Sequence, residues 1–223
     1  MNSLIYGPSG AGKTVCSTLV KAPNRGRNIL LCSDNSSIVL NNFPRENLDI
    51  VTVEHWLDKD KSGNTQPYFY GQFEAAVDAR KYDTIIVDNI SDIFDMAILE
   101  LADSAKYADM RQAYQLVYQA LKRLARKAAQ LDCNVIFTAW TDIQQITLPS
   151  GEMVNRMQPK LPMKILDNFL GLTQIVGYVT TAVDKKTNTK RWFYALEGTP
   201  DRYGKDQAFN RKTCLPEDIF TKP

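Results

Sequence analysis

The chain carries, close to its start, the segment Gly7-Pro8-Ser9-Gly10-Ala11-Gly12-Lys13-Thr14. The apolar residues 4–6 come directly before it, and residues 15–21 can continue it as a helix that ends before Pro23. A strand, the pattern Gly-x-x-x-x-Gly-Lys-Thr and a helix make up the full context of a phosphate-binding loop. Its glycines allow positive φ, and its successive backbone N–H groups form an anion site at the start of the helix. The segment therefore predicts a nucleoside triphosphate site to which all its residues contribute.

Two side chains of this segment have distinct expected roles. The Lys13 ammonium would reach the β- and γ-phosphates, and the Thr14 hydroxyl would bind Mg²⁺. A second motif supports a metal site, because residues 82–88 (Tyr-Asp-Thr-Ile-Ile-Val-Asp) form a β-branched apolar run that closes on an acid. An acid in this position, Asp88, can hold a metal-bound water. We therefore expect Thr14 and Asp88 to form the Mg²⁺ site.

A general base has to come from elsewhere, because Asn89 and not a Glu follows Asp88. Asp34 is the best candidate. It follows an apolar run at residues 28–32, and the carboxyl ends of neighbouring parallel strands meet in one crevice. The alternative is a turn or capping residue, which is common for Ser-Asp-Asn.

A further polar group could sense the γ-phosphate. It lies at the end of the strand expected at residues 134–139 and directly after it, and consists of Thr138, Thr141 and Asp142.

Composition limits the class of protein. With 223 residues the chain can form one α/β domain with a substantial core. Its net charge of +2 requires no polyanionic partner, and its single histidine makes a zinc site improbable. No apolar run approaches the length of a membrane span, and the N-terminus leads straight into a strand, so we expect no membrane contact and no signal peptide. The four scattered cysteines fit a reducing, cytoplasmic location.

The order of elements predicts the architecture. Apolar runs predict strands at 28–32, 50–53, 82–88 and 134–139, and helical spacing predicts helices at 70–80, 92–105 and 110–131. The last third differs: we expect a hairpin or ordered loop at 144–157, a short helix at 165–170 and an antiparallel pair at 173–181 and 191–196. This order predicts an α/β fold with a mostly parallel sheet, helices on both faces and an antiparallel C-terminal extension. We expect a single domain over 1–223, with the core at 1–142 and the extension at 143–223.

In this order the motifs resemble the core of RecA-type ATPases. The resemblance rests on the phosphate loop, the acid ending the next strand, Ile-Ile-Val-Asp-Asn-Ile-Ser at residues 85–91, and Val-Ile-Phe with a polar exit. Leu161-Pro-Met-Lys, Gln174-Ile-Val-Gly-Tyr and Gly204-Lys-Asp-Gln are similar to the short phage nucleotide-binding proteins of that superfamily, which are reduced recombinases and annealing proteins. The resemblance implies a RecA-like P-loop core and DNA-dependent ATP hydrolysis in recombination or single-strand annealing, in the cytoplasm of a bacterial host.

The resemblance also implies partners and further site residues. Asp34 matches the family's acidic base position, with Asp in place of the more usual Glu, whereas Trp140 stands where a polar residue is usual. A homo-oligomer is expected, in which a neighbour supplies a cation, Lys205, with Arg202, Arg211 or Lys212 able to share the role. Single-stranded DNA is the expected ligand, and a phage or host single-strand-binding protein is an expected partner. DNA contacts are expected from residues 104–111 and 142–164, namely Lys106, Arg111, Arg156, Lys160 and Lys164.

Other classes of function stay open. A small-molecule kinase would need a basic lid, for which Lys185, Lys186, Lys190 and Arg191 are the available residues. A helicase-loader-type ATPase and a scaffold that nucleotide merely stabilises are further alternatives. The guanine-binding pattern Asn-Lys-x-Asp and the Ser-Gly-Gly signature of transporter ATPases are both absent from the sequence, so ATP is the expected nucleotide.

Overall fold

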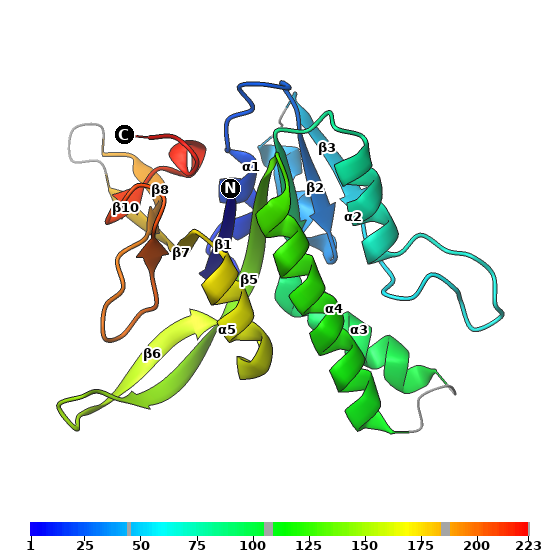
Figure 1. Cartoon of the computed structure of the whole chain (residues 1–223). Helices are drawn as coiled ribbons and strands as arrows, with labels where there is room; N and C mark the ends of the chain where they lie inside the picture. The colour runs from blue at the N-terminus through cyan, green and yellow to red at the C-terminus, as the bar shows by residue number, and fades with distance from the viewer. Residues whose placement is uncertain (44–45, 105–108, 184–187, 223) are drawn as a thin grey trace.

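A mixed β-sheet runs through the computed structural model, which describes residues 1–43, 46–104, 109–183 and 188–222 (Figure 1). Its strand order is β10-β8-β7-β1-β5-β4-β2-β3. The parallel strands are β1 (Asn2–Gly7), β2 (Asn28–Cys32), β3 (Leu48–Thr52), β4 (Thr84–Asp88), β5 (Asn134–Thr147) and β7 (Ile175–Val183). The antiparallel ones are β6 (Met153–Pro159), β8 (Lys190–Ala195), β9 (Lys205–Asp206) and β10 (Thr213–Cys214). The predicted α/β fold, with a mostly parallel sheet and an antiparallel extension, is confirmed.

Helices cover both faces of this sheet. The helices are α1 (Lys13–Thr18), α2 (Phe69–Asp78), α3 (Ile90–Asp103), α4 (Met110–Gln130) and α5 (Met163–Leu172), with 3-10 helices η1 (Asn35–Asn42) and η2 (Pro216–Asp218). Alternate residues of each central strand enter two separate apolar cores. One core packs under α2 to α5, and the other packs under α1, η1 and η2. Because both faces are buried, these strands read as continuous apolar runs.

Strand β5 is longer than the sequence predicts. Beyond Trp140 it leaves β1 and pairs only with β6, so the two strands form a hairpin that projects from the sheet (Figure 1). Ile143 on this hairpin is 64% exposed. Among the described strands this part of β5 pairs with β6 alone, and it lacks the apolar run that marks a central strand. We therefore predicted the two parts of β5 as separate elements.

No helix in the described ranges is long and apolar enough to cross a membrane.

Candidate nucleotide site

The phosphate loop joins β1 to α1, as predicted. Gly10 and Gly12 have φ of 75° and 92°, which side chains with a Cβ rarely adopt. The Lys13 ammonium lies inside the loop and donates to the carbonyl oxygens of Gly7 and Pro8, both at 2.9 Å. Burial lowers the pKa of Lys13, while the carboxylates of Asp88 and Asp34 act to raise it. A buried ammonium held by carbonyl oxygens is well placed to exchange them for phosphate oxygens.

Gly12 is also fixed by a contact that the sequence analysis missed. A Cβ at this position would lie 2.6 Å from Nε1 of Trp192 on β8. The Trp192 ring in turn meets Phe43 edge-on, with ring centroids 6.0 Å apart. The C-terminal extension therefore packs directly on the phosphate loop. In the sequence Trp192 looks like any aromatic residue of a strand, and no pattern marks this contact.

Asp88 is the centre of a buried hydroxyl network. It is 1% exposed and ends β4, which lies between β2 and β5. Its carboxylate accepts hydrogen bonds from Thr14 Oγ1 at 2.6 Å, from Ser36 Oγ at 3.0 Å and from Thr138 Oγ1. Burial raises the pKa of Asp88, and the Thr138 and Thr14 hydroxyls act to lower it. The predicted pairing of Thr14 with Asp88 is present in the structure.

These oxygens suit Mg²⁺. Carboxylate and hydroxyl oxygens are the hard ligands this ion prefers, and it is commonly held by one or two protein groups together with substrate phosphates. No group of three or more His, Cys, Asp or Glu side chains that could hold a metal occurs in the described part of the chain. A site of Thr14 and Asp88 beside the phosphate loop matches a metal that arrives with the nucleotide.

Thr138 has a different contact from the one predicted. Its hydroxyl is fully buried and donates to Asp88, so in this structure its hydrogen bond goes to that carboxylate. Ser36, which we did not predict, joins the same carboxylate from η1. Asp142 lies exposed on the hairpin. The backbone N–H of Trp140 donates to Ser91 Oγ at 3.0 Å.

Asp34 has the capping role that was considered as the alternative for it, and its role as a base stays a prediction. It is the N-cap of η1, where its Oδ1 accepts from the Ser36 N–H at 2.8 Å. Its Oδ2 accepts from Asn89 Nδ2 at 3.3 Å. Ser36 contacts Asp34 and Asp88 together, so the two carboxylates share one crevice although they leave different strands. Asp34 is only half-buried, which leaves its carboxylate accessible to water.

The predicted DNA-contact residues lie on several elements. Arg156 is on β6, Lys164 is on α5 and Arg111 is in the first turn of α4. Lys160 sits 5.0 Å over the Trp140 ring and 3.8 Å from Asp95 of α3. Lys106 lies outside the described residues, as do Lys185 and Lys186 of the kinase alternative.

The basic residues predicted to act on a neighbouring chain lie in different environments. Lys205 pairs with Val176 on β7, whose partner on β1 is Leu4, so its backbone lies beside the middle of the strands and not at the edge that carries the phosphate loop. Its ammonium donates to the Leu170 carbonyl. Arg211 is buried and bonds Asp206 at 2.7 Å, which makes it a structural residue that is not available to a neighbouring chain.

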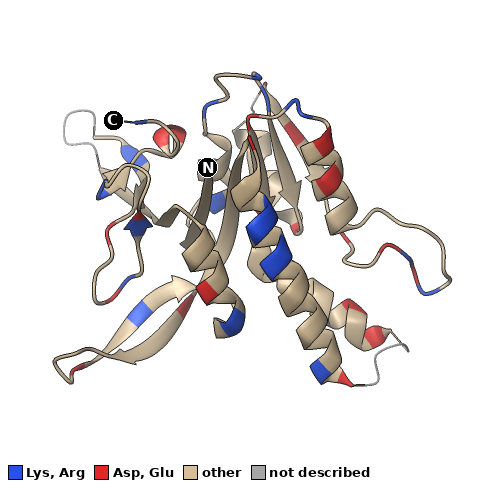
Figure 2. Ribbon diagram, in the orientation of Figure 1, with Lys and Arg blue, Asp and Glu red and all other residues tan. Residues whose placement is uncertain are grey.

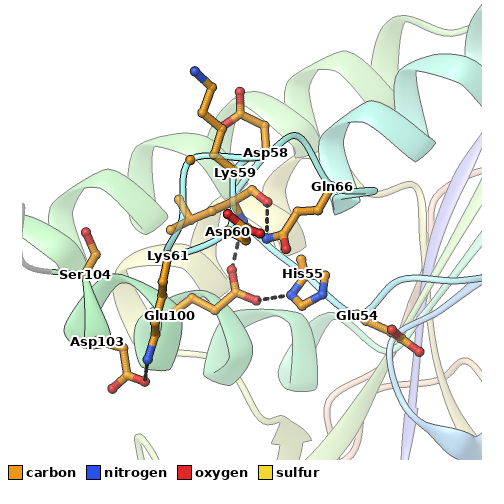
Figure 3. A pocket seen from close by; sticks show the side chains of 12 residues that line it. Glu54, His55, Asp58, Lys59, Asp60, Lys61, Gln66, Glu100, Asp103 and Ser104 are labelled. Carbon is orange, nitrogen blue, oxygen red and sulfur yellow. Dashed lines mark hydrogen bonds and ion pairs between the residues drawn. The ribbon is translucent and has the colours of Figure 1, made fainter.

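A cavity of about 900 Å³ lies away from the phosphate loop, between residues 54–66 and the end of α3 (Figure 3). Glu100 of α3 holds this segment by accepting from the N–H groups of Trp56 and Leu57, at 3.1 and 2.9 Å, and it contacts His55 Nδ1 at 3.2 Å. None of the predicted nucleotide residues lines it. The Glu100 contacts therefore anchor a loop and take no part in the nucleotide site.

Comparison with known proteins agrees with the geometry. The model of a family described as AAA domain matches residues 1–208, so the chain belongs to that family. It is a nucleotide-binding P-loop ATPase. Among solved structures, a KaiC-like protein of the hyperthermophilic archaeon Pyrococcus horikoshii OT3 is similar, with 12% identity, a TM-score of 0.49, and coverage of 90% of this chain and 79% of that one. No curated protein matches the chain.

Proposed function

We propose that this protein hydrolyses ATP in a manner stimulated by single-stranded DNA, in phage recombination or strand annealing. The observation that carries the ATPase part is the contact of Thr14 with Asp88 at the mouth of the phosphate loop. Bound Mg²⁺ would neutralise the charge that develops on the transferred phosphoryl group. The DNA part is supported by the resemblance of the motifs to phage recombinases and by the basic residues on and near the β5–β6 hairpin.

Each residue of the site has one assignment in this proposal. Lys13 moves from the loop carbonyls to the phosphates, and Thr14 and Asp88 hold the metal and its water. Asp34 takes the proton of the attacking water, because it is half-buried in the crevice that contains Asp88. Charge on the phosphoryl group requires a further cation, which we assign to Lys205 of a neighbouring copy in a homo-oligomer.

ATP turnover measured with and without single-stranded DNA tests the proposal. We expect basal hydrolysis that rises several-fold when oligo(dT) is added. Turnover that is indifferent to DNA would contradict the DNA role and favour the kinase or loader alternative. Binding of ATP without any turnover would contradict the enzyme assignment and favour a scaffold that nucleotide stabilises.

The trans assignment is tested by mixing two variants. Lys13→Ala and Lys205→Ala chains are each expected to be inactive alone. At mixed interfaces, a Lys13→Ala chain can supply Lys205 to a partner that retains Lys13, so partial recovery of turnover is expected. A Lys205→Ala variant with full activity on its own would overturn the assignment.

A further inference from the structure

A second cavity, of about 410 Å³, lies between the β5–β6 hairpin and residues 198–205. Three basic residues line it: Arg156 from β6, and Arg202 and Lys205 from the 198–205 loop. The lining contains no Asp or Glu, and within the described ranges none of the three cations forms an ion pair. Figure 2 shows basic residues both on the hairpin and on this loop. The cavity therefore concentrates positive charge without a fixed counter-charge.

Arg202 carries a polar group that lacks a partner. Its Nε atom is buried and has no hydrogen-bond acceptor in the part of the chain that the structure describes. The guanidinium carbon lies 5.9 Å from the ring centroid of Tyr178, within cation–π distance. The neighbouring Asp201 is exposed and accepts from the Thr199 hydroxyl at 2.6 Å. Because this atom is closed off from solvent, the terminal N–H groups of the same guanidinium are the ones that a ligand in the cavity can meet.

The other two cations are partly anchored by main-chain carbonyls. Arg156 Nε donates to the Pro200 carbonyl at 3.3 Å, and the Lys205 ammonium donates to the Leu170 carbonyl. The terminal N–H groups of Arg156 and two further ammonium protons of Lys205 stay available. Partial burial lowers the pKa of Lys205, and an anion in the cavity would stabilise its charged form.

The 198–205 loop holds these groups in a fixed position. A Cβ on Gly204 would lie 2.7 Å from the Glu197 carbonyl oxygen, so the backbone packs too closely for any other residue. The backbone N–H of Tyr203 donates to the Met157 carbonyl at 2.9 Å, which connects the loop to β6. The hydroxyl of Tyr6 on β1 donates to the Tyr203 carbonyl at 2.6 Å. The loop is thus fastened both to the hairpin and to the central sheet.

We propose that Arg156 and Arg202 of this cavity bind a phosphate group, supplied by the backbone of single-stranded DNA, while Lys205 keeps the role toward a neighbouring copy proposed above. Guanidinium groups match phosphate oxygens in geometry and charge, and a bound phosphate would accept from the terminal N–H groups of Arg156 and Arg202. The choice of DNA as the source rests on the proposed function. A phosphate of the nucleotide bound by a neighbouring copy has the same chemistry and is the other source that the test must separate.

The first experiment measures the salt dependence of DNA binding. Fluorescent oligo(dT) is titrated with the full chain at several salt concentrations, for the unaltered protein and for Arg156→Gln/Arg202→Gln. Each lost phosphate contact lowers the slope of log affinity against log salt by about 0.7 for single strands, so the double variant, which loses the one phosphate of the cavity, should lose about 0.7. The control Lys59→Gln/Lys61→Gln removes the same charge from the loop at residues 54–66 and should keep the slope. An unchanged slope in the Arg156→Gln/Arg202→Gln variant would overturn the DNA assignment.

The second experiment observes Arg202 directly in the unaltered chain. Its Nε–H resonance is assigned by NMR as the one that disappears in Arg202→Lys. Inorganic phosphate and oligo(dT) should both shift this resonance, whereas chloride at equal ionic strength should not. A shift with Mg²⁺·ATP and none with oligo(dT) would overturn DNA as the source in favour of a neighbour's nucleotide.

The two experiments separate the cavity from the proposed function. If oligo(dT) does not bind the unaltered chain but inorganic phosphate shifts the Arg202 resonance, the DNA function fails and the phosphate site stands. If oligo(dT) binds with the same slope in the double variant and no ligand shifts the resonance, the phosphate site is wrong and the DNA function stands.

Discussion

The nucleotide site and the C-terminal extension are held together in different ways. Around Asp88 a buried carboxylate is surrounded by hydroxyl donors that central strands and their following helices bring together. In the extension, strands β9 and β10 have only two residues each. There an ion pair between the Arg211 and Asp206 side chains adds to the pairing of β7 with β8 and β9. The nucleotide site depends on the sheet, and the part of the extension beyond β8 depends more on individual polar side chains.

This difference determines what each region contributes. In the nucleotide site the polar side chains around Asp88 form hydrogen bonds with one another, so these side chains are already positioned before a ligand binds. The extension uses Arg211 for its own stability and leaves Arg156, Arg202 and Lys205 without ion-pair partners among the described residues. It also places Trp192 against the phosphate loop. The extension is therefore suited to connect the nucleotide site with a second ligand.

Removal of Arg211 is expected to have the largest effect. Arg211 donates to Asp206 and also to the carbonyls of Asp218, Ile219 and Thr221. Arg211→Ala leaves the buried Asp206 charge uncompensated, so we expect a loss of about 3–5 kcal/mol in the free energy of unfolding. Urea denaturation measures it. Lys212→Ala is the matched control, since its pair with Glu197 is exposed and should contribute little to stability. Equal losses in both variants would contradict the structural role of Arg211.

Lys13→Ala should abolish most of the ATP turnover while the protein stays folded. The Lys13 ammonium contacts only loop carbonyls in the structure, so the core does not depend on it. Loss of one group that stabilises transition-state charge typically costs about 100- to 1,000-fold in kcat. Phosphate release measures the turnover, and circular dichroism checks the fold. Hydrolysis near the normal rate in a folded variant would contradict the phosphate-loop assignment.

Asp34→Asn should spare ATP binding and slow hydrolysis by about 100-fold, the lower range for a general base. Asn retains the capping oxygen that accepts from the Ser36 N–H, so η1 should keep its start. The readout is kcat compared with the dissociation constant of Mg²⁺·ATP. A normal kcat would show that Asp34 is only a capping residue and that the base lies elsewhere.

Asp88→Asn should weaken the Mg²⁺ dependence of nucleotide binding by about 10- to 100-fold, as expected for a residue that orients a metal's ligands. The variant keeps the size of the side chain, and its single oxygen can accept from one of the two hydroxyls, since Thr14 and Thr138 donate to different oxygens of Asp88. The measurement compares ATP affinity with and without Mg²⁺. Thr138→Val, which removes one donor from Asp88, should have the same sign and a smaller effect. Unchanged Mg²⁺ dependence in Asp88→Asn would exclude Asp88 from the metal site.

The central strands and the nucleotide motifs could be predicted because they have local causes. The strand predicted at residues 28–32 has the same first and last residue as β2, and helical spacing predicted the ends of α4 to within one residue. Continuous burial on two faces produces such runs. The phosphate loop and Asp88 can each be recognised from residue type and from their place after a strand. Because parallel strands bring their carboxyl ends to the same edge of the sheet, the two motifs could be predicted to lie close together.

The remaining contacts depend on residues far apart in the chain. Ser36 reaches Asp88 across 52 positions, and Trp192 meets Gly12 from the opposite end of the sequence. Neither contact leaves a periodic pattern, so they become visible only once the sheet is assembled. Arg211 shows the same limit: its sequence context suggested a free cation, and the structure places it in a buried pair.

Calorimetric titration of the full chain with ATP, with and without Mg²⁺, tests the central claim most directly. The contact between Thr14 and Asp88 beside the Lys13 loop predicts one site per chain with clearly tighter binding when Mg²⁺ is present. Lys13→Ala should weaken this binding in the same titration. Absence of ATP binding, or an affinity that ignores Mg²⁺ in the unaltered protein, would contradict the account.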